Sequence, residues 1–445
     1  MSGAFPPDLF AGRRYAVLGL GRNGAAAARA LAGMGAEVIA WDDGEAARAS
    51  LADPAPGISV EPITSMDGLA ALVLSPGIPH RLPVPHPVAA RALAAGVPVL
   101  SDAELLFEAV RRTGSRARFA GITGTNGKST TTALLAHLLA EAGIPNAAGG
   151  NLGPAALSLP LLGDGGVYVL EMSSYMLERL AALRFDAAAL LNLAPDHLDR
   201  HGDLEAYGDV KRHIFERQTG SDLAVLGLDD AWCCEQEQHL QDGPAVLVTV
   251  SGEDGLPAPA PALPGPHNAQ NARAAIAMAR HLGVPEAAIA PALASFPGLA
   301  HRQRRIATID GIDFIDDSKA TNADAAARAL ACYDRIVWIA GGIAKSGGIE
   351  TLSEHFPRIA EVLLIGRDAP MLASTLAANG VRHRIVDTLE AAVPAAFAAA
   401  RSQAAPVVLL SPACASFDQF PNFEVRGQAF GTLVQSLSQR PGSAA

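Results

Sequence analysis

Aromatic residues, charged residues and cysteine are all scarce in this chain of 445 residues. Aromatics make up 5% of it, charged residues 18% and apolar residues 49%. This balance is typical of a compact, alanine-rich globular protein, and the length favours two or three domains. The four cysteines form no CxxC pair and lack the histidine spacing of a zinc site. Two of them are adjacent, so we expect free thiols in a reducing compartment.

Long apolar runs and an excess of positive charge are also missing. No stretch reaches the roughly 18 apolar residues of a membrane span, and residues 1–14 contain no apolar signal core. We therefore expect a soluble, cytoplasmic protein without a membrane partner. The net charge of −11 excludes a general basic surface, and with it a nucleic-acid partner held by such a surface.

The segment 121–132, GITGTNGKSTTT, predicts a phosphate-binding loop between a strand and a helix. In that setting the backbone N–H groups and the helix N-terminus face one point, which favours a bound phosphate. Lys128 would add a charge near the terminal phosphates, and Ser129 or Thr130 a hydroxyl ligand for Mg²⁺. Five residues separate Gly121 from Gly127, one more than in the usual P-loop. A glycine turn that only caps a helix is the alternative.

A second glycine-rich turn, GLGRNG, occupies residues 19–24. A strand is predicted at 14–18 before it, a helix at 25–34 after it, and a second strand at 37–41 that ends at Asp42-Asp43. This pattern indicates a dinucleotide-binding turn with an acidic ribose ligand. A tight strand–helix crossover that uses glycine for close packing is the alternative.

Several further predicted strands end in polar residues, at the edge where α/β sheets bind ligands. Strands at 166–170 and 187–193 lead into Glu171 and into the segment of His197, which are candidate Mg²⁺ ligands, with a structural role as the alternative. A predicted strand at 72–75 similarly runs into a turn, Ser75-Pro76-Gly77. An amphipathic helix at 204–218 carries Lys211, for which a solvated basic face is the alternative.

The last third of the chain repeats the alternation of strands and helices. Residues 251–266 form a Pro/Gly/Ala loop, after which Asn268 and Asn271 could cap a helix or offer their amides to a base. Strands are predicted at 311–317, 335–340, 361–365 and 407–410, which indicates a mostly parallel sheet covered by helices on both faces. The segment 102–116 is expected to link the first two domains. The predicted domains are 1–105, 106–300 and 301–445.

These motifs together resemble the Mur ligase family of peptidoglycan synthesis, over essentially the whole chain. The family forms are GTNGKST, Glu171-x-Ser-Ser, Asn-x-x-x-Asp-His at 192–197, His-Asn-x-x-Asn at 267–271 and Asp-Ser-Lys-Ala-Thr-Asn at 317–322. The ending SPACASFDQFPNFEVRG, with GLGRNG and SPGI, is similar to the members that add D-glutamate. The resemblance implies an α/β fold of three domains: an N-terminal Rossmann-like domain, a central P-loop ATPase-type domain with a mostly parallel sheet, and a C-terminal Rossmann-like domain.

The resemblance also implies an activity and site residues. The activity would be ATP-dependent addition of D-glutamate to UDP-N-acetylmuramoyl-L-alanine through an acyl phosphate, by a cytoplasmic monomer. The implied catalytic residues are Lys128, Glu171, His197 and Lys211, the last as a carbamate; Mg²⁺ would be held by Ser129, Glu171, His197 and Lys211. The implied ATP-binding residues are Gly124, Thr125, Asn126, Gly127, Lys128, Ser129, Thr130, Asn268, Asn271, Arg302 and Asp317.

Two further sets of residues are implied for the other substrates. The UDP-substrate would contact Gly19, Leu20, Gly21, Arg22, Asn23, Asp42, Asp43, Ser75, Pro76, Gly77, Asn151 and Ser173. D-Glutamate would contact Thr321, Lys345, Ser416 and Phe423. The loop of Lys345 departs from the more polar family form.

Three other functions compete with this interpretation. A folylpolyglutamate-synthetase-type ligase shares the phosphate loop but leaves the N-terminal glycine turn without a role. A nicotinamide dehydrogenase would use that turn but leaves GTNGKST unexplained. A catalytically silent nucleotide-binding module would bind nucleotide without releasing phosphate.

Overall fold

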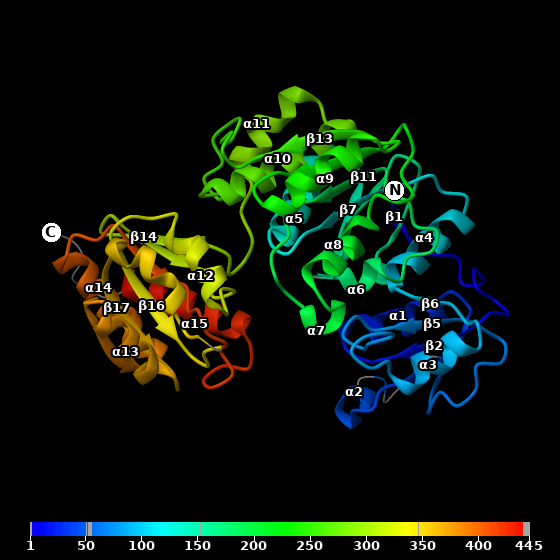
Figure 1. Cartoon of the computed structure of the whole chain (residues 1–445), viewed down its shortest axis with the longest axis horizontal. Helices are drawn as coiled ribbons and strands as arrows, with labels where there is room; N and C mark the ends of the chain where they lie inside the picture. Colours follow the sequence, from blue (N-terminus) through cyan, green and yellow to red (C-terminus); the bar gives the residue numbers. More distant parts are fainter. Residues whose placement is uncertain (1, 50, 52–55, 152, 346, 439–445) are drawn as a thin grey trace. The chain divides into compact units, whose positions relative to one another are not determined.

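The computed structural model describes residues 2–49, 51, 56–151, 153–345 and 347–438. The chain forms two compact units, Met1–Pro259 with Asn268–Ser295 and Ala260–His267 with Phe296–Ala445. The first unit holds a five-stranded sheet, a six-stranded sheet and a two-stranded antiparallel sheet of β1 (Ser2–Gly3) and β9 (Leu161–Leu162). The second unit holds a further six-stranded sheet (Figure 1). The predicted α/β class is confirmed, whereas the division into three domains stays a prediction. Within the described ranges, no helix combines the length and the apolar character that a membrane span requires.

The first sheet is wholly parallel, in the order β4-β3-β2-β5-β6. Its strands are β2 (Arg14–Leu18), β3 (Glu37–Trp41), β4 (Ile58–Val60), β5 (Leu69–Leu74) and β6 (Val99–Leu100). Its helices are α1 (Arg22–Gly33), α2 (Glu45–Ala49) and α3 (Pro87–Ala94). The bounds of β2 and β3 are those predicted. Helix α1 begins before the predicted residue 25, because Gly21 is its N-cap, so the last residues of GLGRNG are helical.

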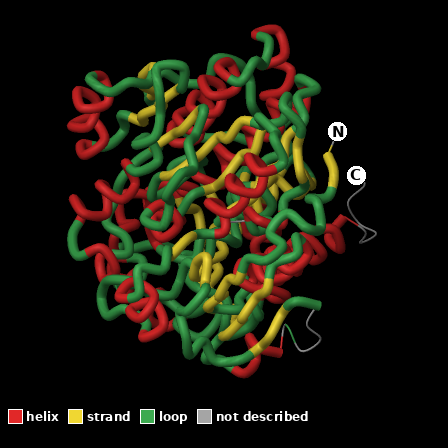
Figure 2. The backbone as a smooth tube through the Cα atoms, turned by 90° about the vertical axis from the view of Figure 1, so that its right-hand side faces the viewer, coloured by secondary structure: helices red, strands yellow, loops and turns green. Residues whose placement is uncertain are grey.

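The second sheet is also parallel, in the order β13-β12-β11-β7-β10-β8. Its strands are β7 (Arg118–Thr123), β8 (Asn146–Gly150), β10 (Val167–Glu171), β11 (Ala187–Leu190), β12 (Leu223–Gly227) and β13 (Val246–Val250). The helices are α4 (Asp102–Arg112), α5 (Lys128–Glu141), α6 (Ser174–Leu177), α7 (Leu198–His201), α8 (Leu204–Arg212), α9 (Ala231–Gln241), α10 (Pro266–His281) and α11 (Glu286–Ser295). Helix α5 packs on β7, β8 and β10, and α9 packs on β12 and β13. Figure 2 distinguishes the helices, in red, from the strands, in yellow.

The segment predicted to link the first two domains contains the buried helix α4. Ser101 caps it by accepting a hydrogen bond from the Glu104 N–H at 3.3 Å. Its apolar face lies in one continuous core with Tyr15 of the first sheet and Tyr168 of the second. The buried carboxylate of Glu104 accepts three backbone N–H groups of residues 181–183, at 2.7 to 3.0 Å. The two larger sheets of the first unit therefore share one apolar core.

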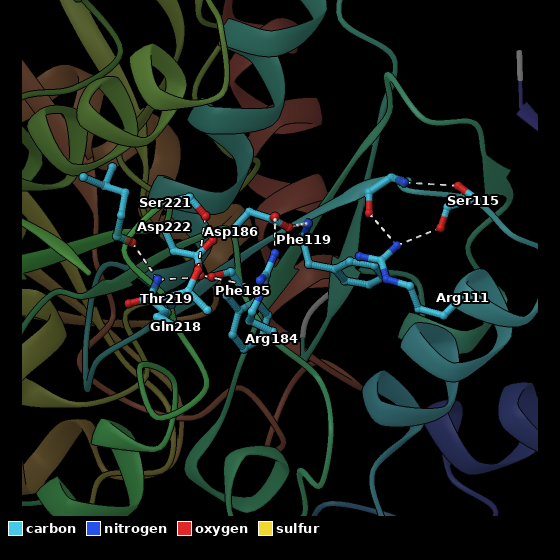
Figure 3. Close-up of polar contacts among 12 residues, drawn as sticks. Arg111, Ser115, Phe119, Arg184, Phe185, Asp186, Gln218, Thr219, Ser221 and Asp222 are labelled. Atoms are coloured by element: carbon cyan, nitrogen blue, oxygen red, sulfur yellow. Dashed lines mark hydrogen bonds and ion pairs between the residues drawn. The ribbon is translucent and has the colours of Figure 1, made fainter. Parts of the chain in front are cut away.

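Polar side chains fix the amino-terminal ends of the central strands (Figure 3). The Asp186 carboxylate, just before β11, accepts the Phe119 N–H of β7 at 2.8 Å. The Arg184 guanidinium lies 3.3 Å from Asp186 and 3.7 Å from Asp222, which precedes β12. Asp222 in turn accepts the Thr219 N–H at 2.6 Å. This network fixes the N-terminal ends of the strands. The loops that follow their C-terminal ends carry no such load and can form a binding site.

The second unit contains one mixed sheet in the order β14-β15-β19-β16-β17-β18. Only β14 runs antiparallel to its neighbour. The strands are β14 (Arg304–Ile309), β15 (Ile312–Asp316), β16 (Ile336–Gly341), β17 (Ile359–Ile365), β18 (His383–Asp387) and β19 (Val407–Leu410). The helices are α12 (Ala323–Leu330), α13 (Ala369–Ala378), α14 (Leu389–Ser402) and α15 (Phe423–Ser438), with the 3₁₀ segment η2 (Glu350–Arg358). Two separate apolar cores cover its two faces, as predicted.

A pH-dependent stability difference is expected for Asp102→Asn. Burial outweighs the backbone N–H groups that bond Asp102, among them Ala156 N–H at 2.8 Å, and raises its pKa from 3.8 to about 6. As pH rises from 3.8 to 6 the unfolded carboxyl ionises while the folded one stays protonated, so the wild type loses stability over that window. The loss is about 3 kcal/mol at most, from roughly two pKa units at about 1.4 kcal/mol each.

Asparagine imitates the protonated carboxyl, so the variant should show no such loss. Urea unfolding at several pH values measures the difference between the two proteins. The difference in free energy of unfolding between Asp102→Asn and the wild type should be small near pH 4 and constant above pH 6. A difference that is the same at all these pH values would contradict the assignment.

Candidate active site

The loop between β7 and α5 has the backbone conformation of a phosphate cradle. Gly124 and Gly127 have φ of +146° and +83°, values that side-chain-bearing residues rarely adopt. A Cβ on Gly127 would lie 2.1 Å from the Asn271 Oδ1, so glycine is required there for space as well. Gly127 is the N-cap of α5, whose first turn carries Ser129 and Thr130. Gly121, by contrast, lies inside β7 against the Phe185 ring, which explains the extra residue in the spacing.

The chain that follows β11 holds this loop from one side. The Asn126 N–H donates to Asn192 Oδ1 at 2.9 Å, and Asn192 Nδ2 donates to the Asn126 carbonyl at 3.1 Å. Thr125 and Ala194 exchange two hydrogen bonds, at 3.1 and 3.0 Å. Strand β11 ends at Leu190 rather than at the predicted residue 193, because the chain leaves the sheet to bind the loop. Asn192 is the first residue of the Asn-x-x-x-Asp-His segment at 192–197, but it was not predicted as a site residue.

Two lysines meet at the glycine loop. Lys128 Nζ donates to the carbonyls of Gly124 and Thr125, at 2.8 and 2.9 Å. Lys211 is only 1% exposed, and its Nζ donates to the same Gly124 carbonyl at 3.0 Å and lies 4.5 Å from the Tyr207 ring centroid. Burial, and then the charge of Lys128, hold the pKa of Lys211 well below its ordinary value. The solvated basic face is therefore wrong for Lys211, and α8 ends at Arg212 rather than at residue 218.

The predicted metal ligands do not form a ready-made cluster. Glu171 is buried at the end of β10, where its Oε1 accepts Asn151 Nδ2 at 3.0 Å. His197 is exposed, adopts a left-handed φ of +53°, and lies 3.4 Å from Asp196 and 5.1 Å, between ring centroids, from Tyr175. No group of three or more His, Cys, Asp or Glu side chains suited to a metal ion occurs among the described residues.

The N-terminal glycine turn is shaped by Asp42 and by close packing. The Asp42 carboxylate accepts the Leu20 N–H at 2.7 Å and the Gly44 N–H at 2.8 Å, so both oxygens bond backbone. A Cβ on Gly24 would lie 1.8 Å from the Gly19 carbonyl oxygen, whereas one on Gly21 would meet no atom within 4 Å. Gly24 is therefore required for close packing between the strand and the helix, which was the alternative to a dinucleotide-binding turn. Gly21 faces open space. The neighbouring carboxylate, Asp43, contacts His86 at 3.0 Å.

Residues predicted to bind the UDP-substrate come together from both sheets of the first unit. Arg22 Nη2 donates to the Asn151 carbonyl, and Asn23 Nδ2 donates to the Gly150 carbonyl, both at 3.3 Å. Ser75 Oγ donates to the Gly19 carbonyl at 2.8 Å. The hydroxyl of Ser173 instead accepts the Met176 N–H at 3.3 Å and so caps α6.

Two arginines that sequence reasoning missed hold the turn containing Ser75, Pro76 and Gly77. The buried Arg179 donates to the carbonyls of Leu74, Ser75 and Ile78, at 2.9, 3.2 and 2.7 Å. Arg200 donates to the Gly77 carbonyl at 3.0 Å. Both arginines come from chain segments about a hundred residues further along, and neither lies in a recognisable motif, so only the fold reveals them.

Neither Asn268 nor Asn271 is the N-cap of α10, which begins at Pro266. Both are buried, and Asn271 Nδ2 donates to Asn268 Oδ1 at 3.3 Å. Because Asn271 also lies against Gly127, this helix contributes amides to the edge of the phosphate loop. Their contact with a base stays a prediction.

The second unit places its predicted residues at the carboxyl edge of its own sheet. The buried Asp317 accepts Ser411 Oγ at 2.7 Å and the Gln303 N–H at 3.2 Å, and burial raises its pKa to about 7. Arg302 lines a cavity of about 370 Å³ together with Tyr333.

The four residues predicted for D-glutamate lie on neighbouring loops of the same edge. Ser416 is buried, Thr321 and Phe423 are half-buried, and Lys345 is exposed. The loop of Lys345 pairs with that of Ser416 through reciprocal backbone hydrogen bonds between Ile343 and Ala415, at 2.9 and 2.8 Å.

Comparison with known proteins identifies the family. Family models described as the Mur ligase middle domain and the Mur ligase, glutamate ligase domain, match residues 122–258 and 301–414. A UDP-N-acetylmuramoylalanine–D-glutamate ligase of Paramagnetospirillum magneticum is 48% identical, over 97% of this chain and 98% of that protein. The chain belongs to the Mur ligase family. A ligase of the same name from Caulobacter vibrioides is 45% identical over 98% of both chains.

Solved structures of other Mur ligases share the fold. UDP-N-acetylmuramate–alanine ligase MurC of Thermotoga maritima has a TM-score of 0.57 at 20% identity, covering 96% of this chain and 99% of that one. MurF of Acinetobacter baumannii also has a TM-score of 0.57, at 18% identity, with 91% of each chain covered. At these identities the likeness concerns the fold alone.

For this Mur ligase, alanine should destabilise the protein far more at Gly24 than at Gly21. Gly24→Ala places a methyl group against the Gly19 carbonyl oxygen and should lower the free energy of unfolding by about 1–3 kcal/mol. Gly21→Ala meets open space at an ordinary φ of −62° and should cost less than about 1 kcal/mol, because alanine is only a poorer N-cap than glycine. Urea denaturation compares the matched pair. Equal destabilisation by both substitutions would contradict the packing described here.

Proposed function

We propose that the chain is an ATP-dependent ligase that adds D-glutamate to UDP-N-acetylmuramoyl-L-alanine during synthesis of peptidoglycan precursors. The observation that carries the proposal is the meeting of Lys128 and the buried Lys211 at one glycine loop that opens onto the N-terminus of α5. The relatives from Paramagnetospirillum and Caulobacter bear the name of this activity and align with nearly the whole chain.

The chemistry requires an activated carboxylate, because joining a carboxylate to an amine in water is uphill. The carboxylate of the UDP-substrate attacks the γ-phosphorus of ATP, which forms an acyl phosphate and releases ADP. The amine of D-glutamate then attacks the acyl carbon, phosphate leaves with the bonding electron pair, and the nitrogen loses a proton. Such phosphoryl transfer depends on positioning and on neutralisation of charge more than on covalent help from the protein.

The first unit offers the groups that hold the phosphates. Backbone N–H groups of the loop at 124–127 and the first turn of α5 favour an anion at this point. The ammonium of Lys128 adds a positive charge at the same loop. The amides of Asn268 and Asn271 border it, and we assign them to the adenine. In the second unit, we assign Arg302 to the phosphates and Asp317 to the ribose.

The residues present fit Mg²⁺ only in part. Ser129 supplies a hydroxyl in the first turn of α5, and Glu171 a buried carboxylate at the end of β10, both oxygen donors of the kind that Mg²⁺ prefers. His197 would supply a nitrogen, and an ammonium at Lys211 would repel the ion. A carbamate on Lys211 would replace that positive charge with a carboxylate and complete the set. Bound Mg²⁺ would neutralise phosphate charge.

The buried lysine is suited to this modification. A neutral amine attacks CO₂, the new N–C bond leaves a carboxylate, and one proton is released to water. Burial and the nearby Lys128 favour the neutral amine by lowering the pKa of Lys211.

Lys211→Ala should lose most ligase activity, and a small carboxylic acid such as acetate should restore part of it by occupying the vacated space. Arg212→Ala is the matched control, because Arg212 is the next residue of α8 and lies partly exposed with Asp209. The control should keep its activity and should not respond to the acid. Phosphate release from ATP measures both. Full activity in Lys211→Ala would remove Lys211 from the catalytic set.

Release of phosphate from ATP tests the whole proposal. With UDP-N-acetylmuramoyl-L-alanine present, D-glutamate should support turnover, and L-glutamate, D-aspartate and L-lysine should support it poorly. Losing one fixed polar contact costs about 1–3 kcal/mol, which is roughly tenfold to a hundredfold in rate. Lys128→Ala is the control for contaminating ATPase and should release no phosphate. Equal turnover of L- and D-glutamate, or turnover with a folate acceptor only, would contradict the proposal.

A further inference from the structure

Arg426 is a buried arginine in the first turns of α15. Its side chain is fully enclosed, with the whole residue 1% exposed. In the part of the chain that the structure describes it forms no salt bridge, and its partners are uncharged oxygens. Nε donates to Ser318 Oγ at 3.0 Å, Nη2 to the Ser318 carbonyl at 2.8 Å, and Nη1 to the Cys414 carbonyl at 3.1 Å. Burial lowers the pKa of Arg426 to about 10, and the charges of Cys414, Asp418 and Asp316 offset that only in part. A buried charge without a carboxylate within hydrogen-bond distance is costly, so a specific structural gain is expected to accompany it.

The three bonds join three separate chain segments. Ser318 follows β15 and lies in the loop that leads to Thr321, whereas Cys414 follows β19 and precedes Ser416 by two residues. The third segment is α15 itself, which begins at Phe423. These are the segments that carry three of the four residues assigned to D-glutamate.

Further contacts hold the start of α15 close to the end of β15 and the loop after it. Ser318 Oγ, which accepts from Arg426, donates to the Phe423 carbonyl at 2.9 Å. The next residue, Gly427, has no room for a side chain, because a Cβ there would lie 2.0 Å from His301 Nδ1. His301 is in turn 2.7 Å from Asp316 at the end of β15. The start of α15 is therefore pressed against the end of β15, and Arg426 fills the space between them and the loop after β19.

We propose that Arg426 is a positioning residue that fixes the separations of Thr321, Ser416 and Phe423 and thereby sets which amino acid the ligase accepts. The inference rests on the proposed function. A dicarboxylic amino acid is recognised by groups on separate loops, so the distance between those loops determines both the length and the handedness that fit. Arg426 itself is buried behind the loops and acts through them.

The geometry of the guanidinium explains why another cation does not replace it. Arginine presents five N–H donors in a rigid plane, which can bond three segments at fixed angles, whereas lysine presents one flexible ammonium. In Arg426→Lys at least one of the three segments loses its donor and can shift. A shift of one loop alters the fit of D-glutamate. Asp317, the ATP-assigned residue beside Ser318, is held separately, because its carboxylate accepts Ser411 Oγ and the Gln303 N–H.

The test compares Arg426→Lys and Arg426→Met with the wild type in the phosphate-release assay. The KM for D-glutamate should rise by about tenfold or more, and the preference for D-glutamate over D-aspartate and L-glutamate should fall several-fold. The KM for ATP should stay within about twofold. Arg358→Lys is the matched control, since Arg358 is an exposed arginine of the same unit that contacts Asp334 and the Ala331 carbonyl; it should leave every parameter unchanged.

A merely structural role would lower the melting temperature and the active fraction without changing the preference among amino acids. If either arginine variant fails to fold, Ser318→Ala decides, because it removes the hydroxyl that links Arg426 to Phe423 and keeps the backbone carbonyl. It should shift the preference in the same direction by a smaller factor. If the folded variants keep the amino-acid preference of the wild type, the role of Arg426 is wrong and the proposed function still stands. If the wild type does not use D-glutamate, the proposed function is wrong.

Discussion

The backbone of the glycine loop is the constraint on which the first unit depends. Gly127 must adopt a positive φ with Asn271 directly against it, and only glycine satisfies both requirements. That conformation lets α5 begin immediately after the loop, so the N-terminus of the helix and the ammonium of Lys128 serve the same point. The segment after β11, the side chain of Lys211 and helix α10 are all arranged around it.

Buried cations recur as the means by which this protein fixes its loops. Among the described residues the buried lysines and arginines are Arg179, Lys211 and Arg426, and each donates to backbone carbonyls of a loop. A cation with several donors can bond several carbonyls that no neighbouring strand reaches, which offsets part of the cost of removing its charge from water. The loops so fixed carry residues predicted to contact the UDP-substrate, phosphate and D-glutamate. The contacts that stabilise these loops are therefore also the contacts that position them.

Sequence patterns located several of the elements whose local signals are strong. Strands β2, β3 and β19 have the predicted bounds because runs such as Arg14–Leu18 are apolar and bounded by turns. Strand β8, with the sequence NAAGG, was not predicted, since it lacks the branched side chains of a strand and forms only by pairing with β10. The antiparallel β14 and the edge strand β18 were missed as well, because exposed strands show little apolar pattern.

The sequence by itself determined the chemistry available, and the tertiary structure decided its arrangement. Motif spacing is local, so GTNGKST, GLGRNG and the strand-end carboxylates predicted an α/β nucleotide-dependent enzyme without a view of the fold. The burial of Lys211, the backbone bonds of Asp42 and the roles of Arg179 and Arg426 depend on groups far apart in the chain. Solvation and hydrogen bonding at each of these side chains are set by neighbours that only folding brings within 4 Å, and no local pattern encodes them.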